Sequence, residues 1–238
     1  MTSRGASSLA VQAFAWGGGA LFAAAMATYV WFFAVTLATP GPPGVDVARA
    51  TVWNVALFIV FAGHHSVMAR SGAKAWLARV LPPALERSAY VWIASVLFLA
   101  VCLLWQRVPG VLYQVPSPAS WFFVATQALG VVFTLAGARV LDALDLAGIR
   151  QARGPAGAAA IRVVWPFTVV RHPIYLGWAL IVWGTPTMTV DRFVWALITT
   201  AYLVIAIPWE ERSLCAVAGP AYLAYRRRVR WRMVPGVY

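Results

Sequence analysis

Residues 9–38 read LAVQAFAWGGGALFAAAMATYVWFFAVTLA, and none of them carries a charge. At ~1.5 Å of rise per residue, a helix of this length exceeds the ~30 Å of hydrocarbon in a bilayer. The run is also longer than the apolar core of a secretory signal peptide, which spans roughly 7–15 residues. We therefore expect it to remain in the protein as a membrane anchor.

The whole chain has the composition of a membrane protein. Of its 238 residues, 62% are hydrophobic and 11% are charged, whereas soluble domains carry roughly 25% charged residues. A soluble domain of this length could not bury so much apolar surface. The two cysteines, Cys102 and Cys215, lie far apart in the sequence, and we interpret both as reduced thiols outside any disulfide or zinc motif.

Six apolar segments predict an all-α fold, a polytopic bundle of transmembrane helices in one membrane domain over residues 1–238. The last two segments are short and are separated only by Asp191 and Arg192, so we expect them to form a helical hairpin. Residues 1–140 then make a four-helix membrane part, and residues 141–238 contain the hairpin and a tail. The segments cover residues 9–38, 52–69, 89–105, 121–138, 174–190 and 193–209.

The distribution of basic residues predicts the orientation in the membrane. Of the nineteen Lys and Arg, only Arg49, Arg107 and Arg192 fall in loops on one side of the six segments. Because cytoplasmic loops carry the excess of Lys and Arg, both termini are expected in the cytoplasm, with the protein in a bacterial inner membrane. The net charge of +12 is explained in this way, so we expect lipid as a partner and no nucleic acid.

Residues 170–177 read VRHPIYLG and place polar groups directly before a membrane helix. Pro173 suits the first helical turn, whose free N–H groups favour an anion. Arg171 adds a planar, permanently charged fork that matches a carboxylate. Tyr175 lies four residues further along, on the same helix face. Gly177 allows another group to approach the backbone closely.

A second polar stretch, WEERSL at residues 209–214, ends the last apolar segment. A hairpin brings the start of one helix and the end of the next to the same membrane face, which places Arg171 and His172 beside Glu210 and Glu211. Adjacent carboxylates at a membrane boundary are costly unless each has a partner.

Three motifs follow one another in the last third of the chain: Arg-His-Pro-x-Tyr-x-Gly (171–177), Glu-Glu-x-x-Leu (210–214) and Gly-x-x-Tyr-x-x-Tyr (219–225). Together they resemble the membrane methyltransferase superfamily of isoprenylcysteine carboxyl methyltransferase and phospholipid N-methyltransferases. Within it, the chain is most similar to methanethiol S-methyltransferases and the related denitrification-associated membrane proteins. That similarity is carried by residues 64–70, 86–88, 145–151 and 183–189.

The resemblance implies that the last hairpin and tail hold S-adenosylmethionine, with the acceptor entering from the lipid side. The carboxylate, ammonium, ribose hydroxyls and adenine of this cofactor match the charged and aromatic side chains of the motifs. Ala218 and the stretch Val229-Arg230-Trp231 depart from the family pattern. The residues predicted to bind the cofactor are Arg171, His172, Tyr175, Gly177, Glu210, Glu211, Tyr222 and Tyr225, and no metal site is predicted.

The leading prediction is an enzyme that methylates a small thiol such as methanethiol to dimethyl sulfide. The thiolate is the nucleophile, so a base must take the thiol proton, and either His65 or His172 is a candidate. Two other functions stay open. A prenylcysteine carboxylate or a lipid amine could be the acceptor, which would require a tunnel for its chain. A non-enzymatic membrane partner of a redox complex would have no cofactor affinity.

Each candidate residue also has a purely structural interpretation. Arg171 could serve as a positive-inside anchor, and the Glu210-Glu211 pair could neutralise tail arginines. His64 and His65 could be interfacial polar residues that join helices.

Overall fold

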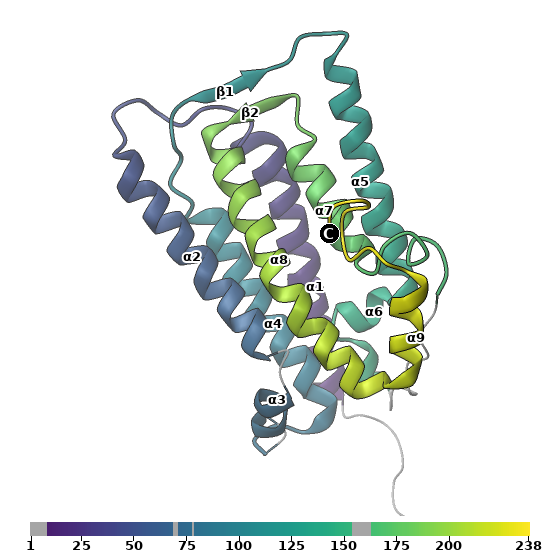
Figure 1. Cartoon of the computed structure of the whole chain (residues 1–238). Coiled ribbons are helices and arrows are strands. Elements are labelled where there is room, and N and C mark those ends of the chain that lie inside the picture. Colours follow the sequence, from purple (N-terminus) through teal and green to yellow (C-terminus); the bar gives the residue numbers. More distant parts are fainter. Residues whose placement is uncertain (1–8, 69–70, 78, 154–162) are drawn as a thin grey trace, which may run out of the picture. The chain divides into compact units, whose positions relative to one another are not determined.

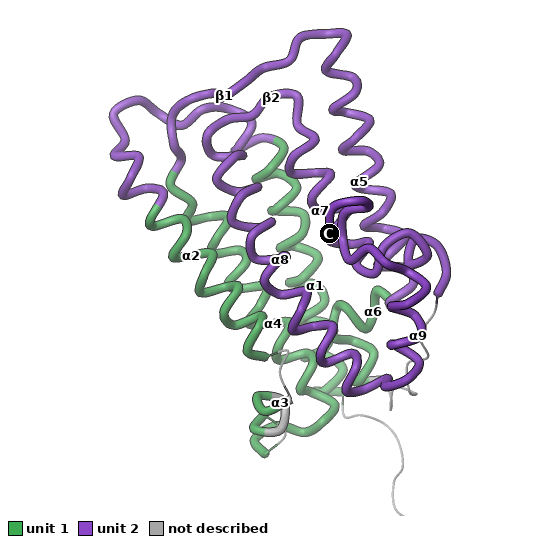
Figure 2. Tube along the Cα trace, in the orientation of Figure 1, with its two compact units in different colours: residues 1–34, 52–106, 142–159 green, residues 35–51, 107–141, 160–238 purple. Residues whose placement is uncertain are grey.

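The computed structural model describes residues 9–68, 71–77, 79–153 and 163–238. These residues are mostly helical, as the sequence predicts, and they form two compact units (Figures 1 and 2). Unit 1 comprises residues 1–34, 52–106 and 142–159, and unit 2 comprises residues 35–51, 107–141 and 160–238. All of the polar contacts described below lie within one unit.

Five helices among the described residues are long and apolar enough to cross a bilayer. The first four match the predicted segments to within a few residues, which confirms the prediction of an integral membrane protein. The remaining helices are short. The five long elements are α1 (Leu9–Trp31) with η1 (Phe32–Thr36), α2 (Val47–Met68), α4 (Pro83–Leu103), α5 (Ser120–Val140) and α8 (Val190–Ala218). The shorter ones are α3 (Ser71–Leu77), α6 (Ala143–Leu146), η2 (Arg150–Arg153), α7 (Pro173–Trp183) and α9 (Pro220–Arg228).

Unit 1 is held together by close packing of α1 on α4 and by polar contacts at both ends of its helices. The Asn54 side chain, which is fully buried, exchanges two hydrogen bonds of 2.8 Å with the backbone of Gln106. Ser88 of α4 donates to the carbonyl of Gly148 at 2.6 Å. This second contact fixes the segment containing α6 and η2 against the start of α4.

Unit 2 is built on the antiparallel pair α5 and α7. Gly130 faces Gly177 and Ile181, while Gly137 faces Ile174. An added Cβ on Gly177 would meet Thr134 Oγ1 and would lie 2.5 Å from the carbonyl oxygen of Gly130. The two helices can therefore approach this closely only because neither glycine carries a side chain.

The predicted fifth segment, residues 174–190, is only partly helical. Helix α7 ends at Trp183, and residues 187–189 form strand β2 (Thr187–Thr189), which pairs antiparallel with β1 (Val111–Gln114). At ~1.5 Å per residue, α7 covers only about half of the hydrocarbon thickness. Pro186 has no N–H to continue a helix. Thr185 before it is fully buried, and so are Met188 and Thr189 of the strand that follows.

The prediction that Asp191 and Arg192 form the turn between the last two segments is wrong. Both are buried in the first turn of α8. The Asp191 carboxylate accepts the N–H of Val108 at 3.0 Å, and Arg192 Nη1 donates to Thr185 Oγ1 and to the carbonyl of Thr187, both at 2.8 Å. These charges therefore satisfy polar groups of the non-helical backbone instead of facing water.

Helix α8 is also longer than the predicted sixth segment, which ends at residue 209. It continues through Pro208 to Ala218, so Glu210 and Glu211 lie about two turns before its end. The tail then forms α9 and folds back, because Met233 packs into the same core as Val170 of the segment before α7.

Candidate functional site

Arg171 and His172, which lie directly before α7, donate hydrogen bonds to four consecutive carbonyl groups of the tail, those of residues 229–232. The Nη1 group of Arg171 donates to the first two, each at 2.8 Å. The backbone N–H groups of Arg171 and His172 donate to the last two, at 2.9 and 2.8 Å. Arg171 therefore fixes the path of the tail through both its side chain and its backbone.

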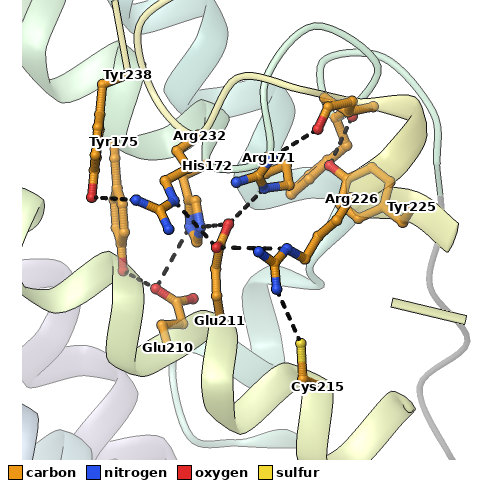
Figure 3. A network of polar contacts seen from close by, with 12 residues as sticks. Arg171, His172, Tyr175, Glu210, Glu211, Cys215, Tyr225, Arg226, Arg232 and Tyr238 are labelled. Atoms are coloured by element: carbon orange, nitrogen blue, oxygen red, sulfur yellow. Dashed lines mark hydrogen bonds and ion pairs between the residues drawn. The ribbon is translucent and has the colours of Figure 1, made fainter. Parts of the chain in front are cut away.

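Glu211 is the centre of the charge network in unit 2 (Figure 3). Its side chain, which is 3% exposed, accepts from Arg171 Nε at 2.5 Å. Arg232 Nε lies 3.3 Å away, His172 Nε2 3.5 Å and Arg226 Nε 4.0 Å. One buried carboxylate thus faces three guanidinium groups, and the surroundings keep a net positive charge.

Glu210 has a different environment from its neighbour. Its side chain is 42% exposed and accepts the Tyr175 hydroxyl at 2.8 Å, with His172 Nδ1 at 3.6 Å. The His172 and Tyr175 rings are stacked, with centroids 5.3 Å apart (Figure 3). The two glutamates therefore differ. Glu211 is buried among arginines, whereas Glu210 is exposed enough to contact a ligand.

An open pocket of about 660 Å³ adjoins this network. Its lining contains five guanidinium groups, two aromatic rings and no acidic side chain. Most of these residues were not predicted to line a ligand site, because the tail arginines were interpreted only as positive-inside charges. The lining residues are Arg171, Leu223, Arg226, Arg227, Arg230, Trp231, Arg232 and Tyr238.

Tyr222 and Tyr225 lie on the buried face of α9 with their rings 5.8 Å apart. Tyr225 donates its hydroxyl to the carbonyl of Phe167 at 2.8 Å. The Tyr222 hydroxyl is buried and finds no hydrogen-bond partner among the described residues. Burial, and then the Glu211 carboxylate, raise the pKa of Tyr222, while burial raises the pKa of Tyr225 to about 12. Both phenols therefore stay protonated and can act as donors.

The structure brings most of the predicted site residues together in unit 2. Gly177 is an exception, because the close approach predicted there is made by helix α5. His65 is the other, since it belongs to α2 in unit 1, where its Nδ1 lies 2.5 Å from the Tyr90 hydroxyl. The residues that do meet in unit 2 are Arg171, His172, Tyr175, Glu210, Glu211, Tyr222 and Tyr225.

These groups suit a zwitterionic ligand with an aromatic ring. Guanidinium groups bind a carboxylate, and the faces of Trp231 and Tyr238 can pack against a heterocycle. The partly exposed Glu210 can accept from an ammonium or from hydroxyls. The Tyr222 hydroxyl, which has no partner among the described residues, offers a donor. S-adenosylmethionine carries each of these groups, so the residues present fit it. No cluster of His, Cys, Asp or Glu that could hold a metal occurs in the described ranges.

Comparison with known proteins gives clear relatives. Methanethiol S-methyltransferase 2 of Bradyrhizobium diazoefficiens is 37% identical over 199 residues, covering 79% of this chain and 77% of the relative. Methanethiol S-methyltransferase of Mycobacterium tuberculosis is 39% identical over 194 residues, with coverages of 77% and 78%. Nurim of Sus scrofa is 29% identical over 176 residues, with coverages of 68% and 67%. No family model and no solved structure matches the chain.

Proposed function

The chain belongs to the methanethiol S-methyltransferase family, and on that premise we propose that it transfers the methyl group of S-adenosylmethionine to methanethiol. The products are dimethyl sulfide, S-adenosylhomocysteine and a proton. When bound, S-adenosylmethionine supplies a methyl group attached to a positively charged sulfur. The observation that supports its binding in unit 2 is the arginine-lined pocket beside Glu210 and Glu211.

The tail arginines are assigned to the cofactor carboxylate. Arg226 and Arg230 both line the pocket, whereas Arg171 already donates to Glu211 and to two tail carbonyls. Arg171 thus acts mainly by holding the tail that supplies the pocket lining. Glu210 is assigned to the ammonium or the ribose hydroxyls, and Tyr222 donates its hydroxyl. Gly177 is left out of this assignment.

The charge of the pocket favours methyl transfer. Positive charge is lost from sulfur as the methyl group leaves, so a cationic lining disfavours the starting state more than the transition state. Glu211 offsets only part of the charge of the arginines around it.

His172 is assigned to positioning within the cofactor site. It lies between the two carboxylates, at 3.6 Å from Glu210 and 3.5 Å from Glu211, and it stacks on Tyr175. A ring confined in this way orients Glu210 and the first turn of α7. His65 is then the remaining candidate for the thiol proton.

We place the protein in a bacterial inner membrane with both termini in the cytoplasm. This orientation requires an even number of crossings. We assign the crossing that makes the number even to α7 and the extended residues 184–189 together. Pairing of β2 with β1, and the antiparallel packing of α7 on α5, support one continuous crossing. Non-helical backbone is tolerated at membrane depth where protein covers it.

Calorimetric titration with S-adenosylmethionine tests the cofactor site, on purified protein in detergent. Wild-type protein should bind, and Arg230→Gln and Glu210→Gln should each weaken binding at least roughly tenfold, as expected for loss of a charge-assisted contact. Arg212→Gln is the matched control, because Arg212 lies over the Trp209 ring at 4.7 Å and does not line the pocket. Absence of binding by folded wild-type protein would contradict the proposal and favour the non-enzymatic partner.

A further inference from the structure

Helix α8 contains a proline, Pro208, in its interior. Because proline has no N–H, the carbonyl of Val204, four residues earlier, loses its hydrogen-bond donor within the helix. The Tyr238 hydroxyl replaces that donor and lies 3.2 Å from the Val204 carbonyl oxygen. Tyr238 is therefore bound to α8 at a carbonyl that an uninterrupted helix would satisfy itself.

A turn of the tail backbone brings Tyr238 to this position. The N–H groups of Met233 and Val234 donate to the Tyr238 carbonyl at 2.9 and 3.1 Å, and the Tyr238 N–H donates to the Val234 carbonyl at 2.9 Å. Gly236 has φ +80°, a conformation in which a side chain would be strained. These bonds use only the backbone of Tyr238, so the turn does not depend on its hydroxyl.

The Tyr238 side chain also contacts the Arg232 guanidinium (Figure 3). Arg232 Nη1 donates to the Tyr238 hydroxyl at 3.2 Å, and the guanidinium carbon lies over the Tyr238 ring, 5.1 Å from its centroid. On its other side, Arg232 Nε donates to Glu211 Oε2 at 3.3 Å. The Tyr238 hydroxyl thus donates to α8 and accepts from Arg232, which connects the guanidinium to the helix.

One donor group of Arg232 remains available to a ligand. Within the described residues its Nη2 makes no hydrogen bond, and Arg232 lines the arginine-lined pocket. The side chain is 32% exposed, so a ligand can reach it. A guanidinium that is already confined by two hydrogen bonds loses less conformational freedom when it binds an anion, and this increases affinity.

We propose that Tyr238 is a positioning residue of the cofactor site, and that Arg232, which it orients, binds the carboxylate of S-adenosylmethionine through Nη2. The inference rests on the proposed function and extends it, because only Arg226 and Arg230 were assigned to that carboxylate above. Tyr238 acts through Arg232, and its hydroxyl carries this role separately from its ring.

Calorimetric titration of Tyr238→Phe, Arg232→Gln and the double variant with S-adenosylmethionine tests this role. Tyr238→Phe keeps the ring and should weaken binding roughly three- to tenfold, as expected for loss of one ordinary hydrogen bond. Arg232→Gln should weaken binding at least roughly tenfold, because a charge-assisted contact is lost. The double variant should bind no more weakly than Arg232→Gln alone, since the hydroxyl acts through the guanidinium.

Tyr113→Phe is the matched control. The Tyr113 hydroxyl also donates to a backbone carbonyl at 3.2 Å, that of Thr185 in the same unit, and Tyr113 does not line the pocket. Both variants lose the same type of bond and should lose similar stability in thermal unfolding, but only Tyr238→Phe should lose affinity for S-adenosylmethionine. A second ligand, 5′-methylthioadenosine, contains the adenosine of the cofactor but no carboxylate, and it should bind wild type and Tyr238→Phe equally.

Steady-state kinetics with methanethiol gives a further measurement. Tyr238→Phe should raise KM for S-adenosylmethionine by a similar factor and leave kcat unchanged, because the carboxylate takes no part in the methyl transfer. Additive losses in the double variant would overturn the inference, as would wild-type affinity in Tyr238→Phe or an equal loss of affinity for 5′-methylthioadenosine. Folded wild-type protein that binds no S-adenosylmethionine would contradict the proposed function, and the inference with it.

Discussion

Arg171 and Glu211, forty residues apart, form a buried ion pair with Nε and Oε1 2.5 Å apart and side chains 6% and 3% exposed. The pair joins the segment directly before α7 to the last third of α8. Through the further bonds of Arg171 to the tail carbonyls, it also connects both helices to the segment that lines the arginine pocket. The site in unit 2 therefore depends on this pair for its assembly.

Glu211→Ala should lower the free energy of unfolding by about 3–5 kcal/mol, because it leaves the guanidinium of Arg171 buried without its carboxylate. Thermal unfolding in detergent measures the change. Arg150→Gln is the control, since the Arg150–Asp142 pair is 53% and 37% exposed and such pairs contribute at most about 1 kcal/mol. Equal losses of stability in the two variants would show that the buried Arg171–Glu211 pair contributes no more to stability than an exposed pair.

Tyr222→Phe and Tyr225→Phe should separate binding from stability. Tyr225 loses its hydrogen bond to Phe167, which costs about 1 kcal/mol of stability, whereas Tyr222 loses a hydroxyl that has no hydrogen-bond partner in the part of the chain that the structure describes. Tyr222→Phe should instead weaken S-adenosylmethionine binding. Unfolding and calorimetry on both variants provide the comparison, and a stability loss confined to Tyr222→Phe would contradict it.

Alkaline pH should destabilise unit 2 through Tyr225. Burial raises its pKa from 10 to about 12, so the unfolded chain releases the phenol proton first. The stabilising contribution is complete below pH 10 and is lost as the pH rises to about 12. Melting temperatures of wild type and Tyr225→Phe between pH 8 and 12 should converge across this window. Parallel curves would mean that Tyr225 ionises normally.

Gly177→Ala should disrupt the α5–α7 contact, because the added Cβ would overlap with the backbone of Gly130 and the side chain of Thr134. Overpacking of this kind costs about 1–3 kcal/mol. Gly63→Ala is a suitable control, since a Cβ at this helical position meets no atom within 4 Å. Protein yield and thermal unfolding in detergent measure the difference, and a tolerated Gly177→Ala would mean that α5 can shift.

The spanning helices could be predicted from the sequence because hydrocarbon thickness sets the length of an apolar run. The end of α7 at Trp183 was not predicted. Residues 184–189 are uncharged, so the predicted segment continued to residue 190, with Pro186 expected only to kink it. Their extended form is stabilised by Arg192 and by pairing with β1, which are tertiary contacts.

Motif and topology together predicted that Arg171 and His172 would meet Glu210 and Glu211. The role of Arg171 in binding the tail was not predicted, because its partners there are backbone carbonyls. Every residue has such a carbonyl, so no sequence pattern identifies these partners. The arginine pocket was missed for a related reason. The positive-inside rule already accounted for the tail arginines, and nothing further in the sequence indicated that they line a ligand pocket.

The most direct measurement uses purified protein, S-adenosylmethionine with a deuterated methyl group, and methanethiol, with mass spectrometry of the volatile product. We predict dimethyl sulfide carrying one deuterated methyl group, formed at a rate that falls in Arg230→Gln and Glu210→Gln but not in Arg212→Gln. Folded protein that binds the cofactor but forms no labelled dimethyl sulfide would contradict methanethiol as the acceptor.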